Sequence, residues 1–326
     1  MKIALHLLKS LKHGGGETVA LNYAKILNDL DVKSVFVGKK VSLEFTDMIS
    51  KYGNVQEKIS KSDILKSDYL FVHTNMNLLK LIRYLPLIKR HKKRVFYIQH
   101  LNYSERKFSI LCKIINLVCT DFIQITPIIA TNVKKYVKIK TSYLNNFYLN
   151  LEKEKDWDEI RRIKRQELNI NSTAEVIMFS AVFKEGKGLR DMLDLVLTTI
   201  ESSEKDYVYL IVGDGPERYL IENFKYRNKV IWTGFVNRVE DYLIASDIYF
   251  FPSLFNFEMM PMALIEAINL NKKILSYKTD INDYLLNDLT CKNLDEVLHN
   301  LKNDIYPGEM MKYNYQYAFK KFSDIL

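Results

Sequence analysis

Residues 251–267 read FPSLFNFEMMPMALIEA and show in one place the pattern on which the expected fold rests, a strand followed by a loop and a helix. An apolar strand ends at Pro252, a loop carries Glu258, and Pro261 suits the first position of a helix. Glu266 lies eight residues after Glu258, inside the apolar run 262–268, where a carboxylate needs a partner. Solvation of two surface glutamates is the alternative interpretation, and it fits Glu266 less well. The stretch predicts a strand, a loop and a helix whose free N-terminal amides can bind an anion.

Outward from this stretch, strands alternate with helices along the whole chain. The expected strands are 2–7, 32–37, 69–73, 94–99 and 122–126, followed by 174–182, 207–212, 230–232, 247–251 and 273–276. Apolar strands that alternate with helices are typical of parallel sheets covered on both faces. We therefore expect an α/β chain of two Rossmann-like, doubly wound parallel-sheet lobes. Ligands of such sheets bind beyond the carboxyl ends of the strands, so we expect the site in a cleft that the two lobes face.

The expected boundaries follow the charge-rich segment 149–166, which contains no sustained apolar run and reads as part of a link. We expect an N-terminal domain at 1–148 and a C-terminal domain at 149–305. Residues 306–326 read as a C-terminal helix, and packing back on the N-terminal domain is one option for it.

Charge is divided unevenly between the two halves. Residues 1–150 contain 25 Lys and Arg against 10 Asp and Glu, whereas residues 151–326 contain 23 against 29. The halves carry +15 and −6, which sum to the net charge of +9. A basic half suits anionic lipid, nucleic acid or a phosphorylated substrate.

The composition also bears on location. No run approaches the roughly 18 apolar residues of a membrane-spanning helix, and the N-terminus reads as a strand rather than a secretion signal. The three cysteines form no C-x-x-C pair, which fits a reducing compartment. We expect a cytoplasmic protein.

Three turns that contain glycine follow predicted strands. FSAVFKEGKG at 179–188 places Lys184 and Lys187 after a strand, LIVGDGPE at 210–217 contains Gly213 and Gly215, and HGGGET at 13–18 precedes a helix. Glycine permits positive φ and close approach of a ligand to the backbone. Taken alone, each turn could equally be an ordinary flexible connection. A Walker lysine and a spaced G-x-G-x-x-G are both missing, which excludes a P-loop NTPase or a dinucleotide enzyme.

His73 and His100 each end a predicted strand, so both could line the edge of the sheet where ligands bind, although a lone histidine is more often structural.

The segment Lys80–Arg94 has seven basic residues, no acidic residue and many apolar ones. It fits an anionic membrane surface. A solvated helix with a buried face is an equal alternative, and nucleic acid is not expected because no recognised binding motif is present.

Residues 251–267 resemble the E-x7-E signature of the group 1 retaining glycosyltransferases of GT-B fold, which build bacterial surface glycans. The resemblance implies that Glu266 holds the ribose hydroxyls of a nucleotide and that Glu258 lies by the donor sugar. Carboxylate–hydroxyl hydrogen bonds of this kind are charge-assisted. The resemblance covers most of the chain, most specifically from Ser180 to Lys273.

The same resemblance implies a full set of site residues. The expected catalytic residues are Glu258, His100 and Lys187. The expected donor-binding residues are Gly15, Gly16, Lys184, Lys187, Gly213, Gly215, Phe235, Met259, Met260 and Glu266. His73 and Asn75 are expected on the acceptor side, Asn145 and Asn146 at the hinge, and no metal or cofactor is expected.

The implied function is transfer of a hexose or N-acetylhexosamine from a nucleotide sugar, with UDP-sugars favoured, to a lipid-linked or surface-glycan precursor. Positive groups and amides would stabilise the charge that develops on the leaving diphosphate. One position departs from the family: Val182 stands where an arginine usually binds the diphosphate, although Lys184 could replace it. This departure keeps open a non-catalytic partner subunit of the same fold, and a nucleotide-sugar epimerase is a further alternative.

Overall fold

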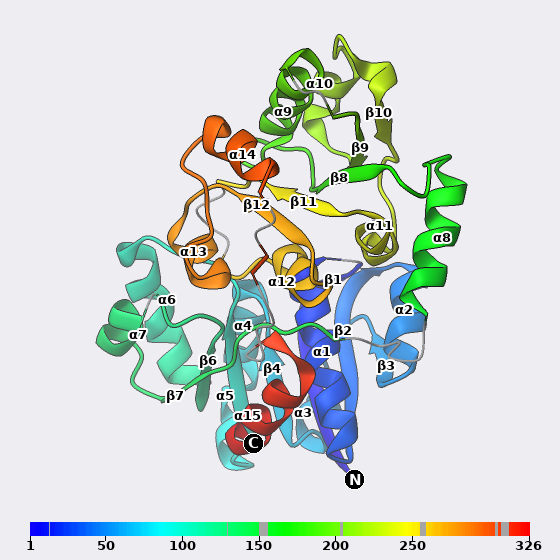
Figure 1. Ribbon diagram of the computed structural model, residues 1–326. Coiled ribbons are helices and arrows are strands. Elements are labelled where there is room, and N and C mark those ends of the chain that lie inside the picture. The colour runs from blue at the N-terminus through cyan, green and yellow to red at the C-terminus, as the bar shows by residue number, and fades with distance from the viewer. Residues whose placement is uncertain are drawn as a thin grey trace. The chain divides into compact units, whose positions relative to one another are not determined.

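The computed structural model describes residues 1–12, 14–128, 130–149, 156–202, 205–254, 259–303, 306–307 and 313–326, without the side chains of residues 44, 130 and 131. The chain forms two compact units. Unit 1 comprises Met1–Leu149, Phe257–Pro261 and Lys312–Leu326, and unit 2 comprises Asn150–Asn256 and Met262–Met311. Each unit contains its own parallel sheet (Figure 1).

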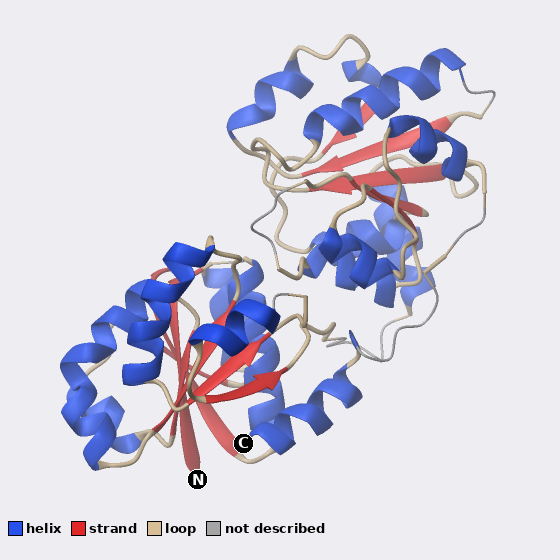
Figure 2. Cartoon of the chain, turned by 90° about the vertical axis from the view of Figure 1, so that its left-hand side faces the viewer, coloured by secondary structure: helices blue, strands red, loops and turns tan. Residues whose placement is uncertain are grey.

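Unit 1 contains a seven-stranded sheet in the order β3-β2-β1-β4-β5-β6-β7. The strands are β1 (Lys2–Leu11), β2 (Val32–Val41), β3 (Gly53–Gln56), β4 (Tyr69–Val72), β5 (Arg94–Gln99), β6 (Asp121–Gln124) and β7 (Lys140–Tyr143). The helices are α1 (Gly15–Asp29), α2 (Leu43–Ser50), α3 (Lys61–Lys66), α4 (Asn75–Leu81), α5 (Leu85–Arg90), α6 (Glu105–Val118), α7 (Ala130–Tyr136) and α15 (Tyr315–Ile325). Helices cover both faces of this sheet (Figure 2).

The two faces of the unit 1 sheet bury different side chains, because neighbouring residues of a strand point to opposite faces. Leu5 and Leu7 of β1 join one core cluster, and Leu8 joins the other, which α1 and α2 cover. The five strands predicted in this half are confirmed. The edge strands β3 and β7 were missed because both are short and mostly polar.

Unit 2 contains a five-stranded parallel sheet in the order β10-β9-β8-β11-β12. The strands are β8 (Glu175–Ser180), β9 (Tyr207–Val212), β10 (Val230–Trp232), β11 (Ile248–Phe251) and β12 (Lys273–Ser276). The helices are α8 (Trp157–Glu167), α9 (Leu189–Ser202), α10 (Tyr219–Glu222), α11 (Val239–Ala245), α12 (Met262–Asn269), α13 (Asp280–Leu286) and α14 (Leu294–Leu301). All five strands predicted in this half are confirmed, as are two doubly wound α/β sheets.

The charge-rich segment predicted as a link contains helix α8. Asp156 caps it by accepting from the backbone N–H groups of residues 158 and 159. Arg165 is buried, and together with Arg161 it binds Asp247 at the start of β11 and nearby backbone carbonyls. The long arginine side chains therefore supply the packing that apolar residues usually supply, which is why the sequence looked unstructured.

Helix α15 belongs to unit 1, and its range is shorter than the predicted 306–326. Phe322 is fully buried, with its ring 4.9 Å from Tyr23 and 5.8 Å from Phe71. Arg94 donates to the backbone carbonyls of Ile325 and Leu326. In the sequence, the second unit therefore lies between the first and last segments of the first unit, whose short middle segment interrupts it.

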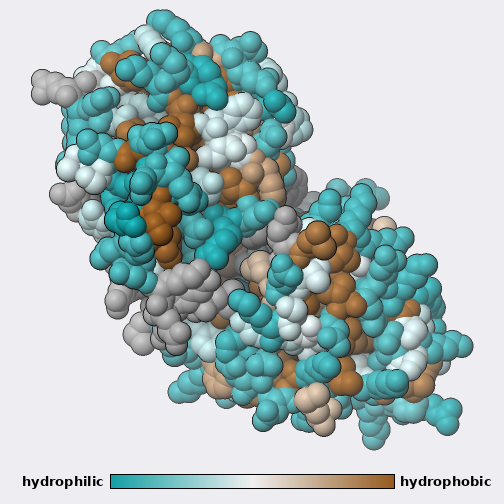
Figure 3. Space-filling model, turned by 90° about the vertical axis from the view of Figure 1, so that its right-hand side faces the viewer, coloured by the Kyte–Doolittle hydropathy of each residue, from teal (hydrophilic) through white to brown (hydrophobic). Residues whose placement is uncertain are grey.

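On the face in Figure 3 the surface is mostly hydrophilic, and the hydrophobic side chains form separate patches. Among the described residues, no helix combines the length and the apolar character needed to cross a membrane.

Candidate functional site

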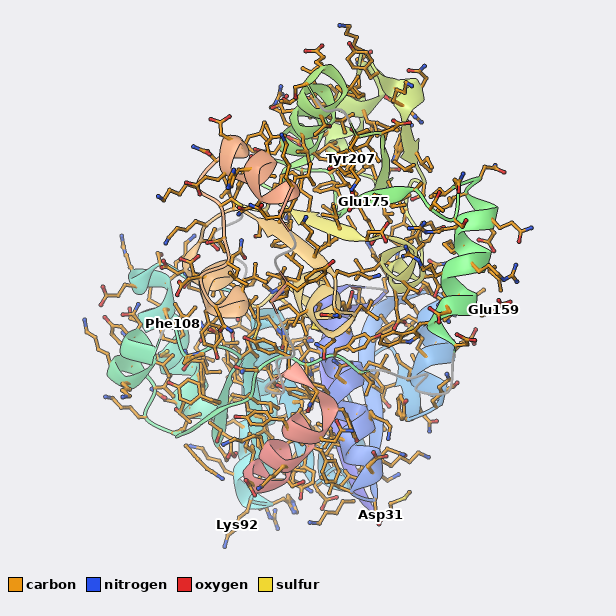
Figure 4. All side chains as sticks on the ribbon, in the orientation of Figure 1. Asp31, Lys92, Phe108, Glu159, Glu175 and Tyr207 are labelled. Atoms are coloured by element: carbon orange, nitrogen blue, oxygen red, sulfur yellow. The ribbon has the colours of Figure 1, made fainter. Side chains whose placement is uncertain are left out.

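The loops that follow β8, β9, β10 and β11 lie at one edge of the unit 2 sheet, because these strands are parallel. We call loops 181–188, 213–217, 233–238 and 252–254 the carboxyl-edge loops. Glu175 and Tyr207 begin β8 and β9 side by side and mark the opposite, amino edge (Figure 4). The carboxyl edge is where sheets of this kind bind ligands.

Backbone hydrogen bonds tie the carboxyl-edge loops together. Phe183 N donates to Asp214 O at 2.9 Å, and Gly213 N donates to Gly234 O at 2.8 Å. Leu254 N donates to Gly186 O at 3.0 Å. Loops that share such bonds hold their polar groups in fixed positions, which is the condition for preorganised binding.

The first of these loops carries Lys184 and Lys187, both partly exposed, in a turn closed by a bond from Lys187 N to Lys184 O at 3.1 Å. Gly188 has a φ of 85°, and a Cβ there would lie 2.4 Å from Cγ of Pro252. The glycine thus lets the lysine loop lie directly on the end of β11. Val182, at the usual arginine position, is 59% exposed, so it fills no core space.

The glycines of the second loop have a packing reason. Gly213 has a φ of 132°, and a Cβ there would lie 1.9 Å from the carbonyl oxygen of Ala181. A Cβ on Gly215 would lie 2.5 Å from the carbonyl oxygen of Phe183. Close approach of the neighbouring loop therefore explains both residues without a ligand, and their donor-binding role stays a prediction.

The third loop follows Trp232, whose indole N–H donates to Gly213 O at 2.9 Å. The guanidinium groups of Arg218 and Arg227 lie 5.6 and 5.5 Å from its ring centroid, within the range of cation–π attraction. Phe235 is 68% exposed and therefore available to a ligand. Sequence reasoning missed the two arginines, because neither lies next to the tryptophan in the sequence.

Glu266 lies on α12, the helix that follows β11, and is half-buried among apolar neighbours. Burial, with a further contribution from the carboxylate of Glu240, raises the pKa of Glu266 from 4.5 to about 8. No described residue donates a hydrogen bond to its carboxyl group. A carboxyl group in this position can accept hydrogen bonds from a bound ligand.

The other predicted site residues of segment 251–267 divide into two groups. Glu258 lies outside the described residues, so its predicted role is untested. Met259 and Met260 are buried in unit 1, where Asn146 Nδ2 donates to Met260 O at 3.0 Å. Asn146 thus fixes the course of the chain just before α12, and the predicted donor contacts of both methionines stay predictions.

In unit 1, helix α1 begins at Gly15, directly after the glycine loop. A Cβ on Gly15 or Gly16 would meet nothing within 4 Å, so open space lies beside both. Glu17 accepts a hydrogen bond from Ser10 Oγ at 3.1 Å in the first turn. The loop can admit a ligand to the helix N-terminus, and its predicted contact with a donor is not tested.

The two predicted histidines lie next to each other in unit 1. His73 Nδ1 lies 3.0 Å from His100 Nε2. His6 of β1, which sequence reasoning missed, adds a contact of 3.3 Å from its Nδ1 to His73 Nε2. The sequence signal for His6 was a histidine inside the otherwise apolar run IALHLL.

Asn75, the other residue predicted on the acceptor side, begins α4. Its side chain accepts a hydrogen bond from Tyr97 Oη at 2.6 Å and donates one to Tyr103 Oη at 3.0 Å.

The side chains of the basic segment Lys80–Arg94 divide into two groups. Lys93 donates to backbone carbonyls of residues 65 and 67, and Arg94 pairs with Asp121, so both cations stabilise unit 1. Exposed side chains on α4, α5 and the turn between them form a mixed stripe, which comprises Met76, Leu79, Lys80, Ile82, Arg83, Pro86, Lys89 and Arg90. Lys92 lies outside it, in the turn before β5, at the same edge of the sheet as Asp31, which precedes β2 (Figure 4).

Comparison with known proteins adds independent information. The sequence profile of the family Glycosyl transferases group 1 matches residues 160–295. No curated protein sequence is a significant match. The structure of Anabaena Alr3699/HepE in complex with UDP-glucose has a TM-score of 0.74 at 15% identity, and covers 99% of this chain and 96% of that one.

Two further structures agree. A glycosyltransferase from Rickettsia africae has a TM-score of 0.73 at 15% identity over 99% of this chain and 97% of its own. WaaG, a glycosyltransferase involved in lipopolysaccharide biosynthesis, has a TM-score of 0.65 at 15% identity over 92% and 89%. At such identities the likeness concerns the fold. The chain has the GT-B fold, and its residues 160–295 match the profile of the glycosyl transferases group 1.

Proposed function

We propose that the chain transfers a hexose or N-acetylhexosamine from a nucleotide sugar, preferably a UDP-sugar, to a lipid-linked or surface-glycan precursor. The observation that carries this proposal is the carboxyl edge of unit 2, where hydrogen-bonded loops hold two lysines and α12 holds Glu266. The family match over residues 160–295 and the likeness to a structure in complex with UDP-glucose support it.

In this proposal, unit 2 binds the nucleotide. The carboxylate of Glu266 accepts hydrogen bonds from the ribose hydroxyls, while Lys184 and Lys187 neutralise the diphosphate. Backbone groups of the loops after β9 and β10 meet the base, and Phe235 packs beside it. As the bond to the sugar breaks, negative charge grows on the diphosphate, and the lysines stabilise it in place. Hydrogen bonds to charged groups are about twice as strong as neutral ones.

We assign the acceptor side to unit 1, through His73, His100 and Asn75. A neutral histidine next to a strand end can hold a sugar hydroxyl without carrying charge. We also propose that the anomeric configuration is retained and that no metal takes part. Among the described residues, no three His, Cys, Asp or Glu side chains are grouped as metal ligands.

The exposed stripe on α4 and α5 supports the proposal that the protein acts at an anionic membrane surface, the inner face of the plasma membrane. It combines apolar side chains such as Met76, Leu79 and Ile82 with four cations. Basic residues near anionic lipid each contribute about 1 kcal/mol. Vesicles with and without phosphatidylglycerol test this point: binding should require the anionic lipid and weaken in Leu79→Ser. Equal binding to neutral vesicles would remove this part of the proposal.

The decisive experiment incubates the protein with UDP- and GDP-sugars and lipid-linked acceptors, and measures release of nucleoside diphosphate. Release should depend on the acceptor and fall at least tenfold in Glu266→Ala, while Asp295→Asn, an exposed position on α14, serves as a surface control. Normal turnover by Glu266→Ala would refute the site assignment.

The same experiment separates the alternatives. Conversion of the donor sugar without an acceptor would identify an epimerase. The exposed Val182 in place of an arginine favours a non-catalytic partner as the second candidate, and calorimetry that detects no binding of any nucleotide sugar would support it. Proton NMR of the product's anomeric signal tests retention.

A further inference from the structure

A line of four side chains crosses unit 1 within its sheet. It runs from Ser34 through His6 and His73 to His100, which come from β2, β1 and the carboxyl ends of β4 and β5. These strands are consecutive neighbours in the sheet. Ser34 Oγ lies 3.4 Å from His6 Nε2. The next two contacts, between His6 and His73 and between His73 and His100, measure 3.3 and 3.0 Å.

The strand register explains the line. Ser34 lies level with residue 4, two residues before His6, and His6 lies level with residue 71, two residues before His73. The pairing of β4 with β5 gives the same offset to His73 and His100. Because residues two apart on a strand share a face, each step stays on one face and moves toward the carboxyl edge.

Burial favours the neutral form of the three imidazoles. His6 and His73 are buried, and His100 is half-buried. Burial lowers the pKa of His6 to about 3 and that of His100 to about 4. Burial, followed by the charges of His100 and His6, lowers the pKa of His73 well below its ordinary value. A neutral imidazole carries one N–H, so every contact in the line needs one hydrogen from one of its two partners.

Only two arrangements of hydrogens satisfy all three contacts. In the inward arrangement, each histidine donates toward Ser34, and the buried hydroxyl hydrogen of Ser34 has no acceptor among the described residues. In the outward arrangement, Ser34 donates to His6 Nε2, His6 Nδ1–H donates to His73, and His73 Nδ1–H donates to His100 Nε2. No buried donor then lacks a partner, and such a donor is costly to leave unpaired.

We propose that Ser34, His6 and His73 are positioning residues that hold His100 with its hydrogen on Nδ1. No described residue is hydrogen-bonded to His100 Nδ1, and this atom is not among the buried polar atoms without a partner, so its N–H is available to a ligand at the carboxyl edge of the sheet. His100 then acts as an uncharged hydrogen-bond donor to a substrate oxygen, and not as a base at that nitrogen. The substrate part of this inference rests on the proposed function, whereas the hydrogen arrangement does not.

Histidine NMR without substrate tests the arrangement. Protein labelled with 15N-histidine should show the Nδ1–H tautomer for His6, His73 and His100 at pH 7, in long-range proton–nitrogen spectra. The loss of one signal set in His100→Gln assigns that residue. An Nε2–H or a doubly protonated His100 would overturn the proposal.

Two variants test the role of the serine. Ser34→Ala removes the hydroxyl hydrogen that fixes the direction, so the Nδ1–H preference of His100, expected at roughly ten to one or more, should fall to a mixture. Ser34→Thr keeps a hydroxyl and should restore the preference. Unchanged tautomers in a folded Ser34→Ala would refute the role of Ser34. If the tautomers behave as expected while no donor and acceptor pair gives transfer, only the proposed function fails.

Discussion

Replacement of Glu266 by glutamine should change how the stability of the protein depends on pH. The pKa of Glu266 is about 8 in the folded protein against an ordinary 4.5. Between these values the folded state holds a proton that the unfolded state has released, so the free energy of unfolding falls as pH rises from about 4.5 to 8. The full difference corresponds to about 5 kcal/mol at roughly 1.4 kcal/mol per pH unit. Since Glu266 is only half-buried, water screens part of it, and we expect about 2 kcal/mol.

Urea unfolding at pH 5 and pH 9 measures this effect. Glutamine cannot ionise, so Glu266→Gln should gain about 2 kcal/mol over the wild type between these two pH values. The exposed Glu185→Gln, in the same unit, should show no such gain. Parallel curves for wild type and Glu266→Gln would refute the environment described for α12.

Nucleotide binding should also release protons from the protein below pH 8, because ribose hydroxyls donate best to the ionised carboxylate of Glu266. Calorimetry of nucleotide binding in buffers of different ionisation enthalpy measures this release.

Three further substitutions probe the loops and the packing of unit 2. Gly213→Ala should lower the free energy of unfolding in urea by about 2–4 kcal/mol, because the alanine would combine a positive φ with a backbone clash. Gly234 also has a positive φ but has open space beside it, so Gly234→Ala should lower the same free energy by about 1–2 kcal/mol. Asp247→Asn should lower the free energy of unfolding by about 2–3 kcal/mol, because it leaves the two arginines of α8 without their anion. The exposed Asp158→Asn should lower it by less than about 1 kcal/mol. Val182→Arg should tighten UDP-sugar binding roughly fivefold or more in calorimetry, since a charge-assisted contact contributes about 1.5–3 kcal/mol, and an unchanged affinity would place the diphosphate elsewhere.

Much of the fold could be predicted because apolar strands and glycine turns have strong local signals. Strand β9, for example, is predicted at its observed bounds, since YVYLIV is a continuous apolar run before a glycine. Helix α8 was missed because its packing uses arginine side chains and backbone carbonyls of distant residues, which no local pattern records.

The candidate site was predictable to the extent that its residues follow strands. Lys187 and Glu266 could be predicted as site residues because the turn after β8 and the helix after β11 have recognisable sequences, and their roles stay predictions. His6 and Ser34 could not, because their importance depends on the register between four strands, and register is set by tertiary pairing. The steric reason for Gly213 was likewise hidden, since its clash partner belongs to another loop.

The placement of α15 has a consequence for synthesis. During translation, all of unit 2 leaves the ribosome before residues 312–326, which complete unit 1. Until then, the side chains that Phe322 covers, among them Tyr23 and Phe71, stay open to water and to chaperones. Domains generally fold as units as they emerge, so the later unit in the sequence can finish first. A chain that ends at Met311 and is tethered to the ribosome by a linker that fills the exit tunnel should then resist protease in unit 2 and remain sensitive in unit 1.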